Sequence, residues 1–197
     1  MSNIKEEYSK RKKDIKKHLE SFNNKNETEK LKELLFCVLT PQSNAEKCWE
    51  AVNLIHEAKS KSDIQNILKG RARFHNTKSD RILSAIIIWP RISSALKTKD
   101  KRELRNWIAE TMPGYGLKEA GHFLRNIGHS ENKIVILDRH ILRNLKSEGV
   151  IEKIEIKGHK GYIDIESFML KFSDEVGIPS DDLDLLFWHK EHGRYFK

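Results

Sequence analysis

Cysteine, proline and long apolar runs are all scarce in this chain of 197 residues. The two cysteines, Cys37 and Cys48, lie among helical apolar positions without metal-ligand spacing, so we expect reduced core thiols in a cytoplasmic protein. Apolar runs such as Ile86–Trp89 are far shorter than the roughly 20 residues of a membrane-spanning helix. Residues 1–17 are rich in charge and lack an apolar centre, so we do not expect a signal peptide.

Acidic residues are fewer than basic ones. The chain has 29 aspartates and glutamates and 37 lysines and arginines, which gives a formal net charge of +8. Nucleic acid is the commonest polyanionic partner of a basic protein that has no membrane segment. A lysine-rich surface that serves only to keep the protein soluble would explain the same net charge. Charge alone therefore leaves a nucleic-acid partner open without deciding it.

Glycine/serine linkers, repeats and low-complexity tracts are absent too, and nearly every segment has helical periodicity. A hydrophobic fraction of 38% can supply a core, and the length suits one domain or two small lobes around a cleft. We expect a single all-α domain over residues 1–197, with two helical lobes, a cleft between them, and N-terminal helices that pack with C-terminal ones. Predicted helices cover residues 4–20, 29–39, 79–89, 100–111, 117–127, 139–147, 163–173 and 180–192, and two more begin near residues 43 and 62.

Local signals mark where several helices begin and end. Ser-x-x-Glu at 43–46, Ser-x-x-Gln at 62–65 and Asp-x-x-Glu at 100–103 are typical of helix starts with a capping side chain. Pro90 should end the helix before it, because proline has no N–H to donate. Residues 150–163 are ambiguous, since their spaced isoleucines would also suit extended chain.

The most informative segment is Met112–Ala120, with the sequence MPGYGLKEA. Gly114 and Gly116 suit a tight helix–hairpin–helix link, because glycine permits unusual dihedral angles and a close approach to the backbone. The second helix begins here, so its free N–H groups and positive dipole end would form a site for an anion such as a DNA phosphate. An ordinary corner between two helices would explain the glycines equally well.

Lys118 lies in the first turn of that second helix, where the partial positive charge of the helix end disfavours a cation. The same setting, with some burial, would lower the pKa of the lysine and leave more neutral amine. A neutral amine can attack the anomeric carbon of a damaged nucleotide. Alternatively, the side chain swings away and contacts phosphate, which helix position alone favours.

Asp138 ends the apolar run Ile134–Leu137 and precedes the predicted helix 139–147. As an N-cap it would accept amide hydrogens of that helix. A carboxylate fixed there could also stabilise an oxocarbenium-like transition state and take up a proton. The two roles are compatible.

The hairpin and these two residues carry a resemblance to a known family. Gly114–Lys118 followed by Asp138 resembles the helix-hairpin-helix-Gly/Pro-Asp superfamily of DNA glycosylases, whose members with lysine at this position are glycosylase/AP lyases. Longer strings are similar to its compact, mainly archaeal 8-oxoguanine DNA glycosylases, and together they cover nearly the whole chain. These strings are Gly116–Gly128, Ile136–Arg143, Leu39–Ser43 with Cys48–Trp49, Phe74–Lys78 and Leu183–Lys197.

The resemblance implies a bifunctional enzyme of base excision repair that removes 8-oxoguanine from double-stranded DNA. Lys118 would form a Schiff base with the sugar and allow β-elimination, and Asp138 would be the catalytic carboxylate. Trp188 and Lys197 match positions that hold the oxidised base. Two departures, Tyr115 between the glycines and Leu137 before the aspartate, leave this assignment unchanged.

Further candidate contacts come from the residues themselves. Gln42, at the head of a helix, is a candidate to hydrogen-bond the edge of a flipped base, although a plain polar residue would fit there too. Trp188 is a residue type more often found in the core, and a terminal lysine usually frays, but Tyr195–Phe196 would anchor the tail. Candidate phosphate contacts are Gly114, Gly116, Arg139 and Arg143, with Arg71, Arg73 and Lys78 as further cations near helix ends.

No cofactor or metal is expected to be required. A four-cysteine tail is missing, which excludes the iron–sulfur cluster of the endonuclease III branch. A structural monovalent cation on the hairpin carbonyls is known in the superfamily and is compatible with this chain. We expect a monomer that acts in the cytoplasm, bound to DNA at the nucleoid.

Two rival functions stay open at this point. A non-enzymatic helix-hairpin-helix module would use the hairpin for phosphate contact alone, with salt-dependent binding and no preference for damage. A glycosylase for a different oxidised base would keep the same chemistry. Oligonucleotides that each carry one lesion would separate these possibilities.

Overall fold

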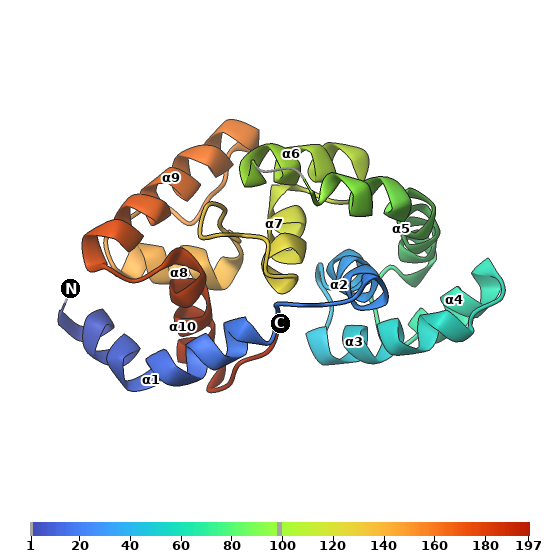
Figure 1. Cartoon of the computed structure of the whole chain (residues 1–197), viewed down its shortest axis with the longest axis horizontal. Coiled ribbons are helices and arrows are strands. Elements are labelled where there is room, and N and C mark those ends of the chain that lie inside the picture. The colour runs from blue at the N-terminus through green and yellow to red at the C-terminus, as the bar shows by residue number, and fades with distance from the viewer. Residues whose placement is uncertain (1, 98–99) are drawn as a thin grey trace. The chain divides into compact units, whose positions relative to one another are not determined.

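The computed structural model describes residues 2–97 and 100–197, and all regular structure within these ranges is helical (Figure 1). This confirms the all-α prediction. No helix in the described ranges is long and apolar enough to cross a bilayer. The helices are α1 (Ser2–Glu20), α2 (Glu27–Leu39), α3 (Ala45–Leu54), the 3-10 helix η1 (Ile55–Glu57), α4 (Lys61–Leu68), α5 (His75–Ala95), α6 (Lys101–Thr111), α7 (Leu117–Asn126), α8 (Arg139–Ser147), α9 (Gly158–Val176) and α10 (Ser180–His192).

The chain divides into two compact units. The terminal unit joins the N-terminal segment up to Asn24 with Leu124–Lys197, and the central unit is Lys25–Phe123. Helix α7 begins in the central unit and ends in the terminal unit. Lys118 therefore belongs to the central unit and Asp138 to the terminal unit.

In the terminal unit, helix α1 packs against α10, as the sequence predicts for the two ends of the chain. The Tyr8 hydroxyl donates to Asp182 Oδ2 at 2.7 Å, and Lys16 Nζ lies 2.9 Å from Asp182 Oδ1. Arg11 Nε donates to His189 Nδ1 at 3.1 Å. Fully buried apolar side chains such as Ile15 each stabilise the fold by about 1.5–3 kcal/mol.

In the central unit, α2 packs against α3 and α5, and α4 packs against α5. Leu34, Phe36 and Ile82 are fully buried there. Helix α2 begins two residues before the predicted start, because Asn26 and Glu29 form a capping box. Asn26 Oδ1 accepts from the Glu29 N–H at 2.9 Å, and Glu29 Oε2 accepts from the Asn26 N–H at 2.7 Å.

Helix α5 does not end before Pro90 as predicted but continues to Ala95. Proline removes only the hydrogen bond to the carbonyl of Ile86. Ile86 is 40% exposed, whereas Ile92, beyond the proline, is completely buried. Burial of Ile92 therefore holds the last turn in helical form, and water can reach the side of the helix where the bond is missing.

The start of α3 also differs from the prediction. Asn44, not Ser43, is the N-cap, and its side chain accepts from the Lys47 N–H at 3.0 Å. The Ser43 hydroxyl accepts instead from the Arg73 N–H at 3.0 Å, a bond to a residue far along the chain. The local cap is therefore one residue later than predicted, and Ser43 makes a tertiary contact.

Helix α4 begins after Ser60 rather than after Ser62, because Ser60 and Asp63 form a capping box. Asp100 caps α6 as predicted and accepts from the Glu103 N–H at 2.7 Å. Helix α9 begins at Gly158, so the extended chain considered for 150–163 is wrong for its last residues. Residues 150–157 have neither helix nor strand.

Candidate active site

The predicted hairpin is present between α6 and α7 and is anchored by Tyr115. Gly114 has a φ of +80°, a left-handed conformation that favours glycine. The Tyr115 N–H donates to the Met112 carbonyl at 3.1 Å, which closes the turn. The Tyr115 hydroxyl donates to the Leu34 carbonyl of α2 at 2.6 Å, and burial raises the pKa of this phenol well above its ordinary value. The residue that departs from the superfamily pattern therefore fastens the hairpin to its own unit.

The space beside Gly114 is occupied by a long side chain, which would have to move if this glycine were replaced. A methyl group at this position would lie 2.3–2.5 Å from three atoms of the Arg81 side chain. The Arg81 side chain of α5 therefore lies directly against the hairpin backbone. Gly116 is less crowded, since a methyl group there would lie 3.3 Å from Glu119 Oε2.

Lys118 lies in the first turn of α7, with 26% of its side chain exposed. Its Nζ is 3.5 Å from Glu119 Oε1, and the other oxygen of that carboxylate accepts from the Gly116 N–H at 3.1 Å. Glu119 thus accepts a hydrogen bond from one of the N–H groups that we predicted to bind a DNA phosphate. Sequence reasoning missed Glu119, although its position three residues after Gly116 matches the second half of a capping box.

Asp138 is the N-cap of α8, as predicted. Its Oδ1 accepts from the N–H groups of His140 at 2.8 Å and Ile141 at 2.9 Å. Both bonds use the same oxygen, so Oδ2 takes no part in the cap. The carboxylate is half-buried, which leaves it able to meet a ligand while its position is fixed.

The segment before Asp138 is held by two side chains of α9 that sequence reasoning missed. Tyr162 donates from its hydroxyl to the Val135 carbonyl at 2.6 Å and accepts from the Leu137 N–H at 3.2 Å. Glu166 Oε1 accepts from the Val135 N–H at 2.9 Å. Backbone groups that lie in no helix are thereby satisfied in the core, and Asp138 follows at a fixed position.

Trp188 lies in a cluster of rings close to Asp138 within the terminal unit. The His192 ring stacks on it with a centroid distance of 3.9 Å and an interplanar angle of 15°. His140 meets the same indole edge-on at 5.3 Å, and its backbone N–H is one of the two that bind Asp138. Trp188 is half-buried, and His192 covers one of its faces.

The C-terminal tail is anchored through Tyr195 and Phe196, as predicted. His18 Nε2 lies 2.5 Å from the Phe196 carbonyl oxygen. The Tyr195 ring packs against His18 at 5.6 Å and His189 at 4.9 Å. Lys197 is half-buried at the end of this tail.

Gln42 is exposed on the turn before α3, not within the helix. Its φ of 57° places it in the left-handed region, an uncommon conformation for a residue with a side chain. It borders a hollow of about 270 Å³, whose other lining residues belong to the start of α3 and to the segment before α5. They are Ser43, Asn44, Lys47, Gly70, Arg71, Ala72 and Arg73.

The candidate phosphate contacts differ in their surroundings. Arg73, Arg139 and Arg143 are exposed, which is compatible with that role. Lys78 is only 2% exposed and its ammonium group is bonded inside the protein, so its prediction as a phosphate contact is wrong. Beside Arg73, Phe74 is 55% exposed at a φ of 58°, with the guanidinium 5.3 Å from its ring centroid.

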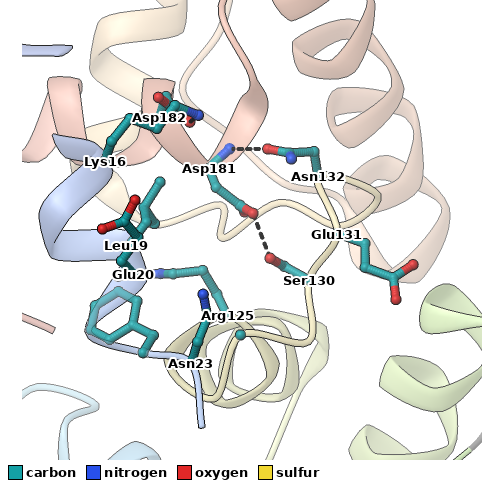
Figure 2. A pocket seen from close by; sticks show the side chains of 12 residues that line it. Lys16, Leu19, Glu20, Asn23, Arg125, Ser130, Glu131, Asn132, Asp181 and Asp182 are labelled. Atoms are coloured by element: carbon teal, nitrogen blue, oxygen red, sulfur yellow. Dashed lines mark hydrogen bonds and ion pairs between the residues drawn. The ribbon is translucent and has the colours of Figure 1, made fainter. Parts of the chain in front are cut away.

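A second hollow, of about 200 Å³, lies in the terminal unit, but it includes none of the predicted site residues. Figure 2 shows that Ser130 and Asn132 approach Asp181. Ser130 Oγ donates to Asp181 Oδ2 at 2.5 Å, and the Asp181 N–H donates to Asn132 Oδ1 at 3.1 Å. Because these polar groups bond to one another, we do not assign the hollow to the site.

No group of three or more histidine, cysteine, aspartate or glutamate residues within 2–97 and 100–197 could hold a metal ion. The two cysteines are buried and are not joined in a disulfide, as predicted for core thiols. Burial raises the pKa of the Cys48 thiol to about 11. Neither thiol is therefore suited to act as a nucleophile.

Comparison with known proteins identifies the family of this chain. A family model described as 8-oxoguanine DNA glycosylase matches residues 11–178. A Fusobacterium nucleatum protein named 8-oxoguanine DNA glycosylase/AP lyase is 40% identical over 182 residues, which cover 84% of this chain and 81% of that protein. A Methanocaldococcus jannaschii protein of the same name is 30% identical over 183 residues, with 90% and 87% covered.

Solved structures give the same result. The crystal structure of the Methanocaldococcus jannaschii 8-oxoguanine DNA glycosylase matches with a TM-score of 0.89 and 29% identity, covering 100% of this chain and 95% of that one. A structure of the glycosylase/lyase from the same organism, in complex with a 15mer DNA containing 8-oxoguanine, matches with a TM-score of 0.89, 27% identity and full coverage of both chains. The chain belongs to the 8-oxoguanine DNA glycosylase family.

Proposed function

We propose that this protein removes 8-oxoguanine from DNA and then cleaves the strand at the abasic site. Its relatives carry both activities in their name, and a similar solved chain holds DNA with this lesion. The observation that supports the lyase step is Lys118, a partly exposed amine at the start of the helix that follows the hairpin.

The proposed reaction begins when the unprotonated Lys118 amine attacks the C1′ carbon of the damaged nucleotide. A bond forms between Nζ and C1′ while the bond between C1′ and the base breaks, and the base leaves with a proton. Asp138 assists through the oxygen that does not cap α8, by stabilising positive charge on the sugar and accepting a proton. The sugar ring opens to an imine, a proton leaves C2′, and the bond to the 3′ phosphate breaks.

We assign base recognition to Trp188, Lys197 and Gln42. Trp188 offers a ring for stacking, the anchored tail carries Lys197 in a half-buried position, and Gln42 presents an amide from an exposed turn. Phosphate contacts are assigned to the hairpin amides of Gly114 and Gly116 and to the exposed Arg139 and Arg143, and Glu119 would have to release the Gly116 N–H when a phosphate binds.

No four-cysteine iron–sulfur cluster enters this proposal, because the chain has only two cysteines. A monovalent cation would suit the hairpin carbonyls. The Met112 carbonyl accepts from Tyr115 and keeps a second lone pair for such an ion. We propose that the protein acts as a monomer on DNA in the cytoplasm, where its free thiols would stay reduced.

A panel of duplexes, each with one lesion, tests this function. The protein should excise 8-oxoguanine and nick the strand, and borohydride should trap a covalent protein–DNA adduct. Salt-dependent binding without excision or adduct would instead identify a DNA-binding module. Excision of another oxidised base with no reaction at 8-oxoguanine would replace the substrate and keep the chemistry.

A further inference from the structure

Lys78, on α5, is a buried cation that the proposed chemistry does not use. It is 2% exposed, and a buried charge is stable only when its hydrogen bonds are satisfied. Its Nζ donates to the Leu39 carbonyl at 2.6 Å, the Pro41 carbonyl at 2.8 Å and the Ser43 hydroxyl at 3.0 Å. These three acceptors match the three N–H bonds of an ammonium group.

All three acceptors belong to one short turn, and they lie on both sides of Gln42. Within that turn, the Ser43 N–H donates to the Thr40 carbonyl at 2.9 Å. Gln42 itself has a φ of 57°, a conformation that costs a residue with a side chain roughly 1–2 kcal/mol. A strained residue persists only where the surrounding structure stabilises its conformation. The three hydrogen bonds from the Lys78 ammonium group stabilise this turn.

Helix α5 itself begins next to a second strained position, and its backbone bonds to it. The Lys78 N–H donates to the carbonyl of Phe74, the left-handed residue that precedes α5, at 2.9 Å. The neighbouring Arg73 N–H donates to the Ser43 hydroxyl, which also accepts from Lys78 Nζ. Lys78 and Ser43 therefore join the two segments that border the hollow containing Gln42.

We propose that Lys78 is a positioning residue that fixes the turn 39–43, so that the Gln42 side chain is presented to the damaged base. This inference rests on the proposed function and deepens it at the step of base recognition. Lys78 does not touch the substrate, because its ammonium group is enclosed by its three acceptors. It acts through the backbone conformation of Gln42.

The charge of Lys78 predicts a pH dependence of base excision that a purely structural role in packing would not produce. Burial lowers the pKa of this lysine to about 8, with Cys48 opposing the decrease and Arg81 and Arg73 adding to it. As pH rises through this value, one of the three hydrogen-bond donors is lost. Recognition of the base should then weaken, whereas cleavage at an abasic site, which has no base to recognise, should not follow the same curve.

The test compares Lys78→Met with Lys59→Met, which removes a charge from an exposed position in the same unit. Lys78→Met should slow single-turnover excision of 8-oxoguanine about tenfold, while cleavage of a preformed abasic site changes less than about twofold. Hydrogen exchange of the Ser43 amide should become faster in this variant and not in Lys59→Met. Lys78→Arg, which keeps a cation at every pH, should recover much of the excision and remove its loss above pH 8.

Ser43→Ala serves as the second variant if Lys78→Met fails to fold, because it removes one acceptor and leaves the lysine two others. It should reduce excision in the same direction and by less. Equal loss of excision and abasic cleavage, or excision equal to that of Lys59→Met, would overturn the positioning role. Failure of the wild-type protein to excise 8-oxoguanine would instead overturn the proposed function, and the same assay reports it separately.

Discussion

The two units hold their candidate site residues in opposite ways. In the terminal unit, Asp138 receives two backbone hydrogen bonds through one oxygen, and Trp188 is stacked on His192. In the central unit, Lys118 has an ion pair to Glu119 at 3.5 Å, and Gln42 lies exposed on a strained turn. Asp138 and Trp188 are thus held by contacts within the terminal unit, whereas Lys118 in the central unit has an ion pair and Gln42 is exposed.

The chemistry gives a reason for this difference. A carboxylate that stabilises developing charge works best when its position costs no reorganisation during the reaction. A lysine that becomes covalently bonded to a sugar must instead release its first partner and reach a new atom. We therefore expect substitutions of Lys118 to remove chemistry alone, and substitutions of Asp138 to affect both chemistry and the helix that it caps.

Replacement of Lys118 should have the largest effect. Lys118→Gln removes the nucleophile but keeps most of the side-chain length, so excision should fall by roughly 10³-fold or more. Borohydride should trap no adduct, while lesion-containing DNA is still bound. Lys59→Gln is the control for the lost charge. A trapped adduct with Lys118→Gln would show that another amine is the nucleophile.

Replacement of Asp138 should separate the two roles of this residue. Asn is as good an N-cap as Asp, so Asp138→Asn should leave stability nearly unchanged while excision falls by about 10²-fold. Asp138→Ala should lose the same activity and also about 1 kcal/mol of unfolding free energy, since the N–H groups of His140 and Ile141 lose their acceptor. Urea unfolding and single-turnover kinetics measure the two effects. Full activity in Asp138→Asn would reject the catalytic role.

What the sequence predicts well in this molecule is local. Asp138 as a cap and the hairpin at Gly114 depend on residues within one or two turns of the chain, and the structure has both. The tail anchor at Tyr195–Phe196 could be predicted from the two aromatic side chains before the end, but its partner His18, far away in the sequence, could not. The roles of the site residues in the reaction come from the resemblance and stay predictions.

What the sequence hides depends on contacts between distant segments. Lys78 has the appearance of an ordinary helix cation, and only the turn 39–43 shows that it is buried and bonded. Pro90 should end a helix, but the burial of Ile92 outweighs one missing hydrogen bond.

Two glycines with similar φ values, one in each unit, allow the cost of a Gly→Ala substitution to be compared between the units. Gly114 in the central unit has a φ of +80° and Gly149 in the terminal unit one of +74°, but only Gly114 has the Arg81 side chain against it. Gly149→Ala should cost about 1 kcal/mol from strain alone, and Gly114→Ala about 2 kcal/mol or more. Chemical unfolding of both variants measures the difference. Equal costs would mean that Arg81 moves aside freely.

The smallest expected effect concerns acid-dependent stability in the terminal unit. Removal from water raises the pKa of Asp181 above its ordinary value, although the Ser130 hydroxyl donates to this carboxylate and opposes the shift. The folded protein then binds a proton more tightly than the unfolded chain does. The contribution of Asp181 to stability is therefore fully present below the unfolded pKa of 3.8 and is lost as pH rises through the folded value.

Asp181→Asn keeps the shape and an acceptor for Ser130 but cannot ionise, so it removes this dependence. Relative to wild type, the variant should gain up to about 1 kcal/mol at pH 7 and nothing at pH 3. Asp174→Asn, at an exposed position of the same unit, controls for the change in net charge. If the stability difference between Asp181→Asn and wild type were the same at both pH values, the buried carboxylate would not be the origin of the effect, and the terminal unit would hold Asp181 as a fully solvated charge.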